Sequence, residues 1–132
     1  AVDLHPVLYG PAQLHFTIDL FYTVKEDGKK KLCIYELSSG TAYTLENGKT
    51  EAAVWNDQIF VCDENGNAEL RSLNDPLIVT KEFKLPYTLR STSAYSPRVI
   101  PVGKNLAFVT SEKTVVLIDK ELKEVASFST EA

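Results

Sequence analysis

The sequence is poor in the side chains that most often carry out chemistry, since it has two cysteines and two histidines among 132 residues. Cys33 and Cys62 are too few for a disulfide scaffold and too far apart for a zinc knuckle, so we expect reduced, buried thiols. His5 and His15 lie near no nucleophile motif such as Gly-x-Ser-x-Gly. The sequence therefore predicts a protein that is not an enzyme and that holds no catalytic residue, metal or cofactor.

Two further motifs, those of phosphate-binding and calcium-binding loops, are also missing. The only Gly-Lys pair that precedes a hydroxyl residue is at positions 48–49, and Tyr43 stands where a phosphate-binding loop requires glycine. The acidic positions 26–27 and 63–64 lack the Asp-x-Asp-x-Asp-Gly spacing of a calcium loop. We therefore expect these segments to be solvated hairpin turns.

Charge and hydropathy give no indication of a nucleic acid or a membrane as partner. The net charge is −4 and the isoelectric point is about 5.2, so the basic surface that binds phosphate backbones is not expected. No apolar run approaches the roughly 18 residues of a membrane span. Residues 1–6 do not resemble a secretory signal peptide, and no Asn-x-Ser/Thr acceptor occurs. We expect an intracellular protein, cytoplasmic or nuclear.

The chain does contain a pattern that occurs three times. Residues 55–73 align with residues 102–120 without a gap, and each stretch holds an apolar run, a polar turn and a second run of alternating apolar residues. A third copy over residues 18–37 places Gly28 under Gly66, and in this alignment Tyr22, Phe60 and Ala107 share one position. A period of about 40–47 residues with four short strands per unit is typical of a β-propeller blade.

The repeat predicts an all-β fold of three four-stranded antiparallel propeller blades, a partial β-propeller, with a β-sandwich as the alternative. The predicted strands are residues 14–18, 21–24, 31–37 and 41–45, then 52–55, 59–62, 68–73 and 77–83, then 98–102, 106–110, 114–118 and 125–128. We expect a single domain over residues 1–132, with a lead segment 1–11, blade one 12–48, blade two 49–86, an inter-blade loop 84–97 and blade three 98–129.

The three units resemble divergent β-propeller repeats of the WD40 type between Leu14 and Phe128, with Ile118-Asp119 in the place of the closing Trp-Asp pair. The resemblance implies a platform for protein partners. Known rings hold about 4–8 blades, so either the chain is a fragment of a longer propeller or a protein partner or a second copy completes the ring. We therefore expect a non-catalytic protein–protein interaction scaffold within a larger complex; the alternative is a self-assembling propeller lectin that binds glycans.

The longest irregular stretch, residues 84–97, is the predicted contact site. It exceeds the usual connection of about 4–6 residues and is rich in hydroxyl and aromatic side chains. Long loops on a rigid scaffold concentrate binding residues, and tyrosine and arginine dominate interface hot spots. The predicted partner-binding residues are therefore Tyr87, Arg90, Tyr95 and Arg98.

Overall fold

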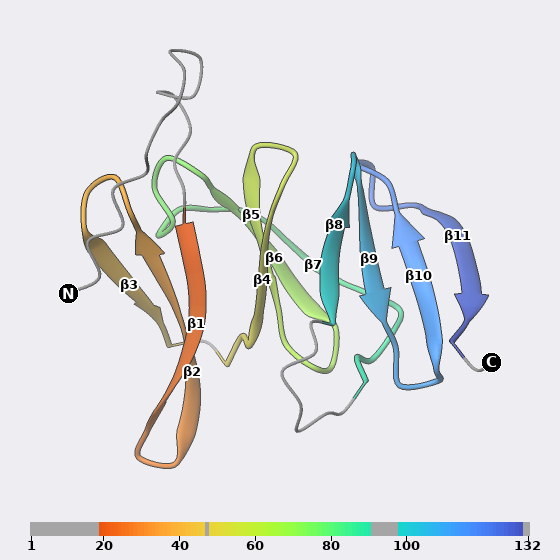
Figure 1. The fold of residues 1–132 in the computed structure, drawn as a ribbon, viewed down its shortest axis with the longest axis horizontal. Helices are drawn as coiled ribbons and strands as arrows, with labels where there is room; N and C mark the ends of the chain where they lie inside the picture. Colours follow the sequence, from red (N-terminus) through yellow and green to blue (C-terminus); the bar gives the residue numbers. More distant parts are fainter. Residues whose placement is uncertain (1–18, 47, 91–97, 131–132) are drawn as a thin grey trace.

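The computed structural model describes residues 19–46, 48–90 and 98–130, and within these ranges the chain forms eleven strands and no helix. The strands make three antiparallel sheets that follow one another along the long axis of the molecule (Figure 1). The predicted all-β fold class is thereby confirmed. The lead segment and the predicted strand 14–18 lie outside the described residues. The part of the chain that is described contains no helix able to cross a membrane.

The first sheet is a meander of three described strands, β1 (Asp19–Glu26), β2 (Lys29–Glu36) and β3 (Thr41–Leu45). The β1–β2 hairpin turns at Asp27 and Gly28, whose φ angles are 51° and 77°. A two-residue type I′ turn requires two positive φ angles, and Asp-Gly adopts them readily. Because both strands are eight residues long, this hairpin extends well beyond the neighbouring sheets (Figure 1).

The second and third sheets each have four strands in sequence order. The second consists of β4 (Glu51–Trp55), β5 (Gln58–Cys62), β6 (Asn67–Ser72) and β7 (Val79–Lys84). The third consists of β8 (Val99–Val102), β9 (Asn105–Val109), β10 (Thr114–Ile118) and β11 (Glu124–Ser129). The pairing register shifts after Leu70 in one sheet and after Leu117 in the other, which are aligned positions of the repeat. The two sheets therefore share geometry as well as sequence pattern.

The second sheet is buried on both faces, and strand β5 shows how. Ile59 and Val61 pack with side chains of the first sheet, whereas Phe60 and Cys62 pack with side chains of the third. Successive side chains of a strand point to opposite faces, so one apolar run supplies both interfaces. We call these contacts the first interface, between sheets one and two, and the second interface, between sheets two and three. Three sheets with two interfaces differ from the two layers of a β-sandwich.

In the second interface, the second and third sheets contact each other along one edge. Strand β4 lies beside β8, and the Trp55 indole Nε1 donates a hydrogen bond of 2.9 Å to the Lys104 carbonyl. Farther out, the rings of Phe60 and Phe108 meet with their centroids 5.6 Å apart. The outer strands β7 and β11 are exposed along almost their whole length. The sheets thus stack like wedges, as propeller blades do.

The structure corrects the alignment of the first repeat by one residue. Phe21 packs with Ile34 in the first interface, on the face of sheet one that is turned toward sheet two. Phe60 lies in the second interface, on the face of sheet two that is turned toward sheet three. Tyr22, which the sequence alignment places under Phe60, lies on the opposite face and is 42% exposed. A shift of one residue moves a side chain to the other face of a sheet. Phe21, not Tyr22, is therefore the equivalent of Phe60.

Candidate partner-binding site

The site is built around the segment that follows β7, residues 85–90, which we call the strap. The strap is bonded to the second sheet through the Leu85 and Leu89 amides, which donate to the carbonyls of Gly66 and Glu64 at 2.8 Å each. It is bonded to the third sheet through the Arg90 amide, which donates to the Val109 carbonyl, and through the Thr88 carbonyl, which accepts from the Ser111 amide. Because both sheets hold it, the strap is a fixed part of the scaffold.

Gly66 allows the strap to lie this close to the β5–β6 turn. Its φ angle is +90°, and a Cβ atom added there would lie 2.5 Å from the Tyr87 carbonyl oxygen and 3.0 Å from that of Leu85. Any other residue would clash with backbone, which cannot rotate out of the way as a side chain can. A glycine at this position is therefore a requirement of the site.

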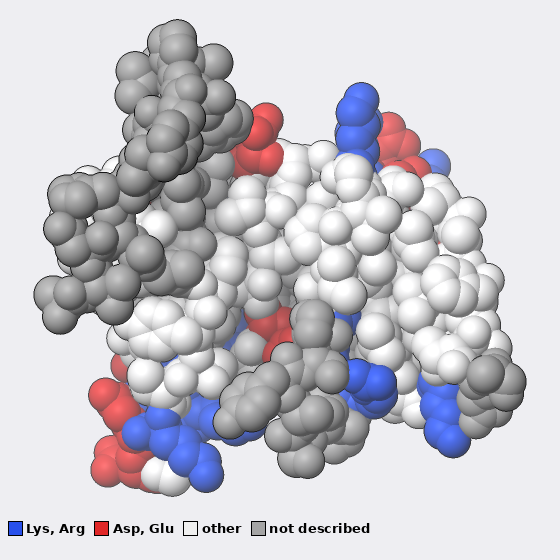
Figure 2. Space-filling view, viewed as in Figure 1, with Lys and Arg blue, Asp and Glu red and all other residues white. Residues whose placement is uncertain are grey.

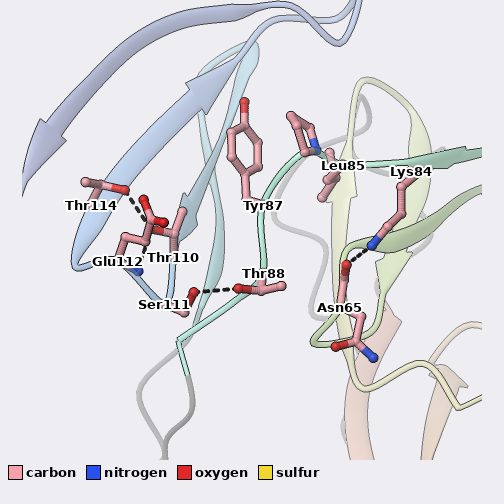
Figure 3. Close-up of a pocket in the computed structure, with 10 residues that line it drawn as sticks. Asn65, Lys84, Leu85, Tyr87, Thr88, Thr110, Ser111, Glu112 and Thr114 are labelled. Atoms are coloured by element: carbon pink, nitrogen blue, oxygen red, sulfur yellow. Dashed lines mark hydrogen bonds between the residues drawn. The ribbon is translucent and has the colours of Figure 1, made fainter.

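A pocket of about 510 Å³ opens between the strap, the β5–β6 turn and the β9–β10 turn (Figure 3). Leu85, Pro86 and Tyr87 supply its apolar side. The polar side is lined by Asn65, Lys84, Thr88, Thr110, Ser111, Glu112 and Thr114. The pocket lies at the end of the molecule where the β1–β2, β5–β6 and β9–β10 turns gather, at the bottom of Figure 1; we call it the turn end.

The hydroxyl groups of the pocket form two pairs. Thr88 is hydrogen-bonded to Ser111 across the pocket, and Thr110 to Thr114 with 2.6 Å between the oxygens (Figure 3). Each pair has two hydroxyl hydrogens and uses one of them internally. One hydrogen of each pair therefore remains to be donated to a carbonyl or carboxylate oxygen of a bound molecule.

The charged lining residues are of opposite sign. The Lys84 ammonium donates a hydrogen bond to the Asn65 carbonyl, which holds it at the β5–β6 turn. Glu112 lies on the opposite side, in the β9–β10 turn, and its amide donates to the Thr110 hydroxyl. A pocket lined by one cation and one anion suits a polar, uncharged group better than an anion.

Tyr87, a predicted contact residue, lines the pocket and is half-buried. Its ring lies 6.2 Å from the Phe108 ring, and its hydroxyl donates a 3.3 Å hydrogen bond to the Glu124 carboxylate at the start of β11. Burial raises the pKa of the Tyr87 hydroxyl, and the nearby Glu124 carboxylate raises it further. Tyr87 therefore stays protonated at neutral pH and is fixed by the third sheet.

Arg98 lies inward rather than at the surface. Its buried guanidinium donates to the Glu51 carboxylate at 2.9 Å, to the Glu64 carboxylate at 3.0 Å and to the Arg90 carbonyl at 2.8 Å. These bonds join the start of β4, the β5–β6 turn and the strap to the segment before β8. The placement favours a role in holding the second interface together, and a direct contact of Arg98 with a partner stays a prediction.

Of the other two predicted contact residues, Arg90 and Tyr95, the structure describes only Arg90. Arg90 is half-buried at the end of the strap, and its Nε has no hydrogen-bond partner in the described part of the chain. Tyr95 lies outside the described residues.

Sequence reasoning missed Thr110 and Ser111, which the polar β9–β10 turn brings opposite the strap. Their only signal was their position in a short hydrophilic turn.

No group of three metal-binding side chains occurs within residues 19–46, 48–90 and 98–130. Cys33 and Cys62 are free, buried thiols in different sheets. Burial raises the pKa of Cys62 far above its ordinary value, so the group is a thiol and not a thiolate at neutral pH. Cys62 packs as a small apolar side chain in the second interface, whereas the Cys33 sulfur is hydrogen-bonded to the Thr44 hydroxyl at 3.5 Å.

No protein-family model matches the chain, and no curated protein does either. Among solved structures, the chain is similar to the crystal structure of BamB from Moraxella catarrhalis, with a TM-score of 0.57 and 11% sequence identity over 84% of this chain. The chain spans about a third, 34%, of the length of that BamB chain. BamB is a β-propeller. The likeness and the three stacked antiparallel sheets together show that the chain has the fold of β-propeller blades.

Proposed function

We propose that the chain is a non-catalytic protein-interaction scaffold, formed by three divergent, WD40-like propeller blades in a ring that a protein partner or a second copy completes. The observation that carries the proposal is the open pocket at the turn end, framed by a strap that is hydrogen-bonded to two sheets. A rigid frame loses little conformational freedom on binding, which favours its use as a platform.

The chemistry of the pocket suits a segment of polypeptide. An apolar side chain of a partner would pack on Leu85, Pro86 and the Tyr87 ring, while the hydroxyl pairs donate to its backbone carbonyls. Aromatic anchors beside adaptable hydroxyl groups are common in protein interfaces.

The lectin alternative gains no support from the described residues. The corrected register makes an aromatic residue recur, since Phe21 and Phe60 are equivalent. Both rings, however, are packed between sheets, whereas a sugar-binding ring must be displayed to solvent. The protein scaffold is therefore the function we propose.

The proposal is tested with two substitutions of the same kind at opposite ends of the molecule. Ser111 and Ser38 are exposed serines in turns, and only Ser111 lines the pocket. Ser111→Arg would fill the pocket, while Ser38→Arg adds the same side chain in the turn between β2 and β3. Each variant is expressed in source cells, and the proteins that co-purify are quantified by mass spectrometry, after circular dichroism has confirmed folding.

We expect at least one protein that wild type and Ser38→Arg retain equally and that Ser111→Arg loses by about tenfold or more, as a steric block costing over 1.4 kcal/mol would produce. Equal recovery of every co-purifying protein by the two variants would contradict the proposed role of the pocket.

A further inference from the structure

The third sheet has a second face, turned away from the second sheet, against which no other described sheet packs. We call it the outer face. Phe128, Val102 and Ile100 lie on it and are 56%, 48% and 39% exposed. Strands β8 to β11 carry a single charged residue, Glu124. Figure 2 accordingly shows uncharged surface over these strands between charged side chains at the two ends. A contiguous apolar surface of this kind marks an interaction site.

The outer face repeats a face that is buried elsewhere in the same molecule. Val115 pairs with Phe128 across β10 and β11 as Ala68 pairs with Phe83 across β6 and β7. Ala68 and Phe83 pack in the second interface. The pairing register is therefore the same in both sheets. The outer face of the third sheet corresponds to the face of the second sheet against which the third sheet packs.

The two faces differ in the size of their side chains. Val102 stands on the outer face where the second sheet has Trp55, and Ala107 stands where it has Phe60. Close packing leaves few voids in protein interiors, so the sheet that covers the outer face must supply the missing bulk. We expect large, mostly uncharged side chains on the surface that docks there.

The middle of the first sheet carries such side chains on the face that points away from the second sheet, while nearer the β1–β2 turn the same face carries Lys31 and Glu26, which form an ion pair. Leu32 and Ile34 pack in the first interface, so Cys33 and Tyr35 of the same strand lie on the opposite face. Tyr22 is paired with Cys33 there and is 42% exposed. Two tyrosine rings are thus neighbours on this face.

We propose that the outer face of the third sheet docks the first sheet of a second copy of this chain, so that two copies close one ring of six blades. The inference rests on the proposed function, and it identifies a second copy of the chain as the source of the blades that complete the ring. The twofold axis of such a dimer relates two identical contacts, each made by the third sheet of one copy and the first sheet of the other. Six blades fall within the known range of about 4–8.

The test measures the mass of the full chain in solution by light scattering over a range of concentrations. The chain has a mass of 14.7 kDa, so the proposed dimer has twice that, 29.4 kDa. Phe128→Glu and Tyr22→Glu each place a charge in the contact from one of its two sides. Since an unpaired charge is costly to bury, each should weaken the dimer by at least about 100-fold and yield monomers.

The control is Ser127→Glu, which adds the same charge one residue away. Ser127 is exposed and lies on the other face of β11, so this variant should remain a dimer. Val102→Glu provides a second variant of the outer face, to be used if Phe128→Glu fails to fold by circular dichroism.

Three results would overturn the proposal: a wild-type monomer at every concentration, a dimer that Phe128→Glu or Tyr22→Glu leaves intact, or a dimer that Ser127→Glu also dissociates. A dimer that Phe128→Glu dissociates and Tyr22→Glu leaves intact would mean that two outer faces stack on each other. A monomer would still leave the proposed scaffold standing if Ser111→Arg, but not Ser38→Arg, loses its protein partner. The two proposals therefore fail separately.

Discussion

Replacing Gly66 with alanine should destabilise the protein more than the same change at Gly28, although both glycines have positive φ angles. The angles are +90° at Gly66 and +77° at Gly28, and a left-handed alanine costs about 1–2 kcal/mol at either position. At Gly28, the chain neighbours aside, no atom of the described residues lies within 4 Å of the added Cβ. We therefore expect Gly28→Ala to cost about 1–2 kcal/mol, the conformational term alone.

At Gly66 the strap must also move, because the added Cβ would lie 2.5 Å from the Tyr87 carbonyl oxygen. That movement threatens the hydrogen bonds that Leu85 and Leu89 donate to the β5–β6 turn, each contributing about 1 kcal/mol. We expect a total loss of about 3–4 kcal/mol for Gly66→Ala. Urea unfolding, followed by the fluorescence of Trp55, measures both variants. Equal losses at the two glycines would refute the account of the strap.

Two further predictions concern single side chains. Arg98→Met keeps the apolar stem but leaves the largely buried Glu51 carboxylate unpaired, so we expect a loss of about 3 kcal/mol in urea unfolding; a loss below about 1 kcal/mol would contradict its joining role. Burial alone would raise the pKa of Asp63, but hydrogen bonds from Asn67 and Asn65 outweigh burial and hold the pKa below its ordinary value. Asp63 therefore stabilises the fold fully above about pH 4, and this contribution is lost as pH falls through the lowered pKa. Urea midpoints measured at decreasing pH should show a smaller acid-dependent decline in Asp63→Asn than in wild type; identical declines would contradict this.

The strands of the second and third sheets could be predicted closely because their repeats align without a gap. Predicted strand 59–62 falls within β5, and predicted strand 114–118 coincides with β10. The alignment of the first repeat with the other two was wrong by one residue. The β1–β2 hairpin is longer than its counterparts, and Gly28 was the one residue that fixed its alignment. A period-two pattern with apolar residues on both faces does not reveal which face a residue occupies.

The candidate site was only partly predictable. The length and composition of the connection after β7 led to the prediction that Tyr87 contacts a partner; Tyr87 lines the pocket, and the contact itself stays a prediction. The bonds of Arg98 to Glu51 and Glu64 span 47 and 34 residues, and no local pattern indicates contacts of that range. The close approach of the strap to Gly66 was hidden for the same reason, since glycine in a turn ordinarily indicates only a positive φ angle.

The stacking of one sheet on the next is the central claim, and a double-mutant cycle between Phe60 and Phe108 tests it most directly. Their rings belong to different sheets and lie 5.6 Å apart. Leucine substitutions, alone and combined, should give a coupling energy of about 0.5–1.5 kcal/mol in urea unfolding. Phe60 and Ile34 pack in different interfaces, so a Phe60→Leu and Ile34→Val cycle should give about zero. Coupling of Phe60 to Ile34 but not to Phe108 would contradict the stacking.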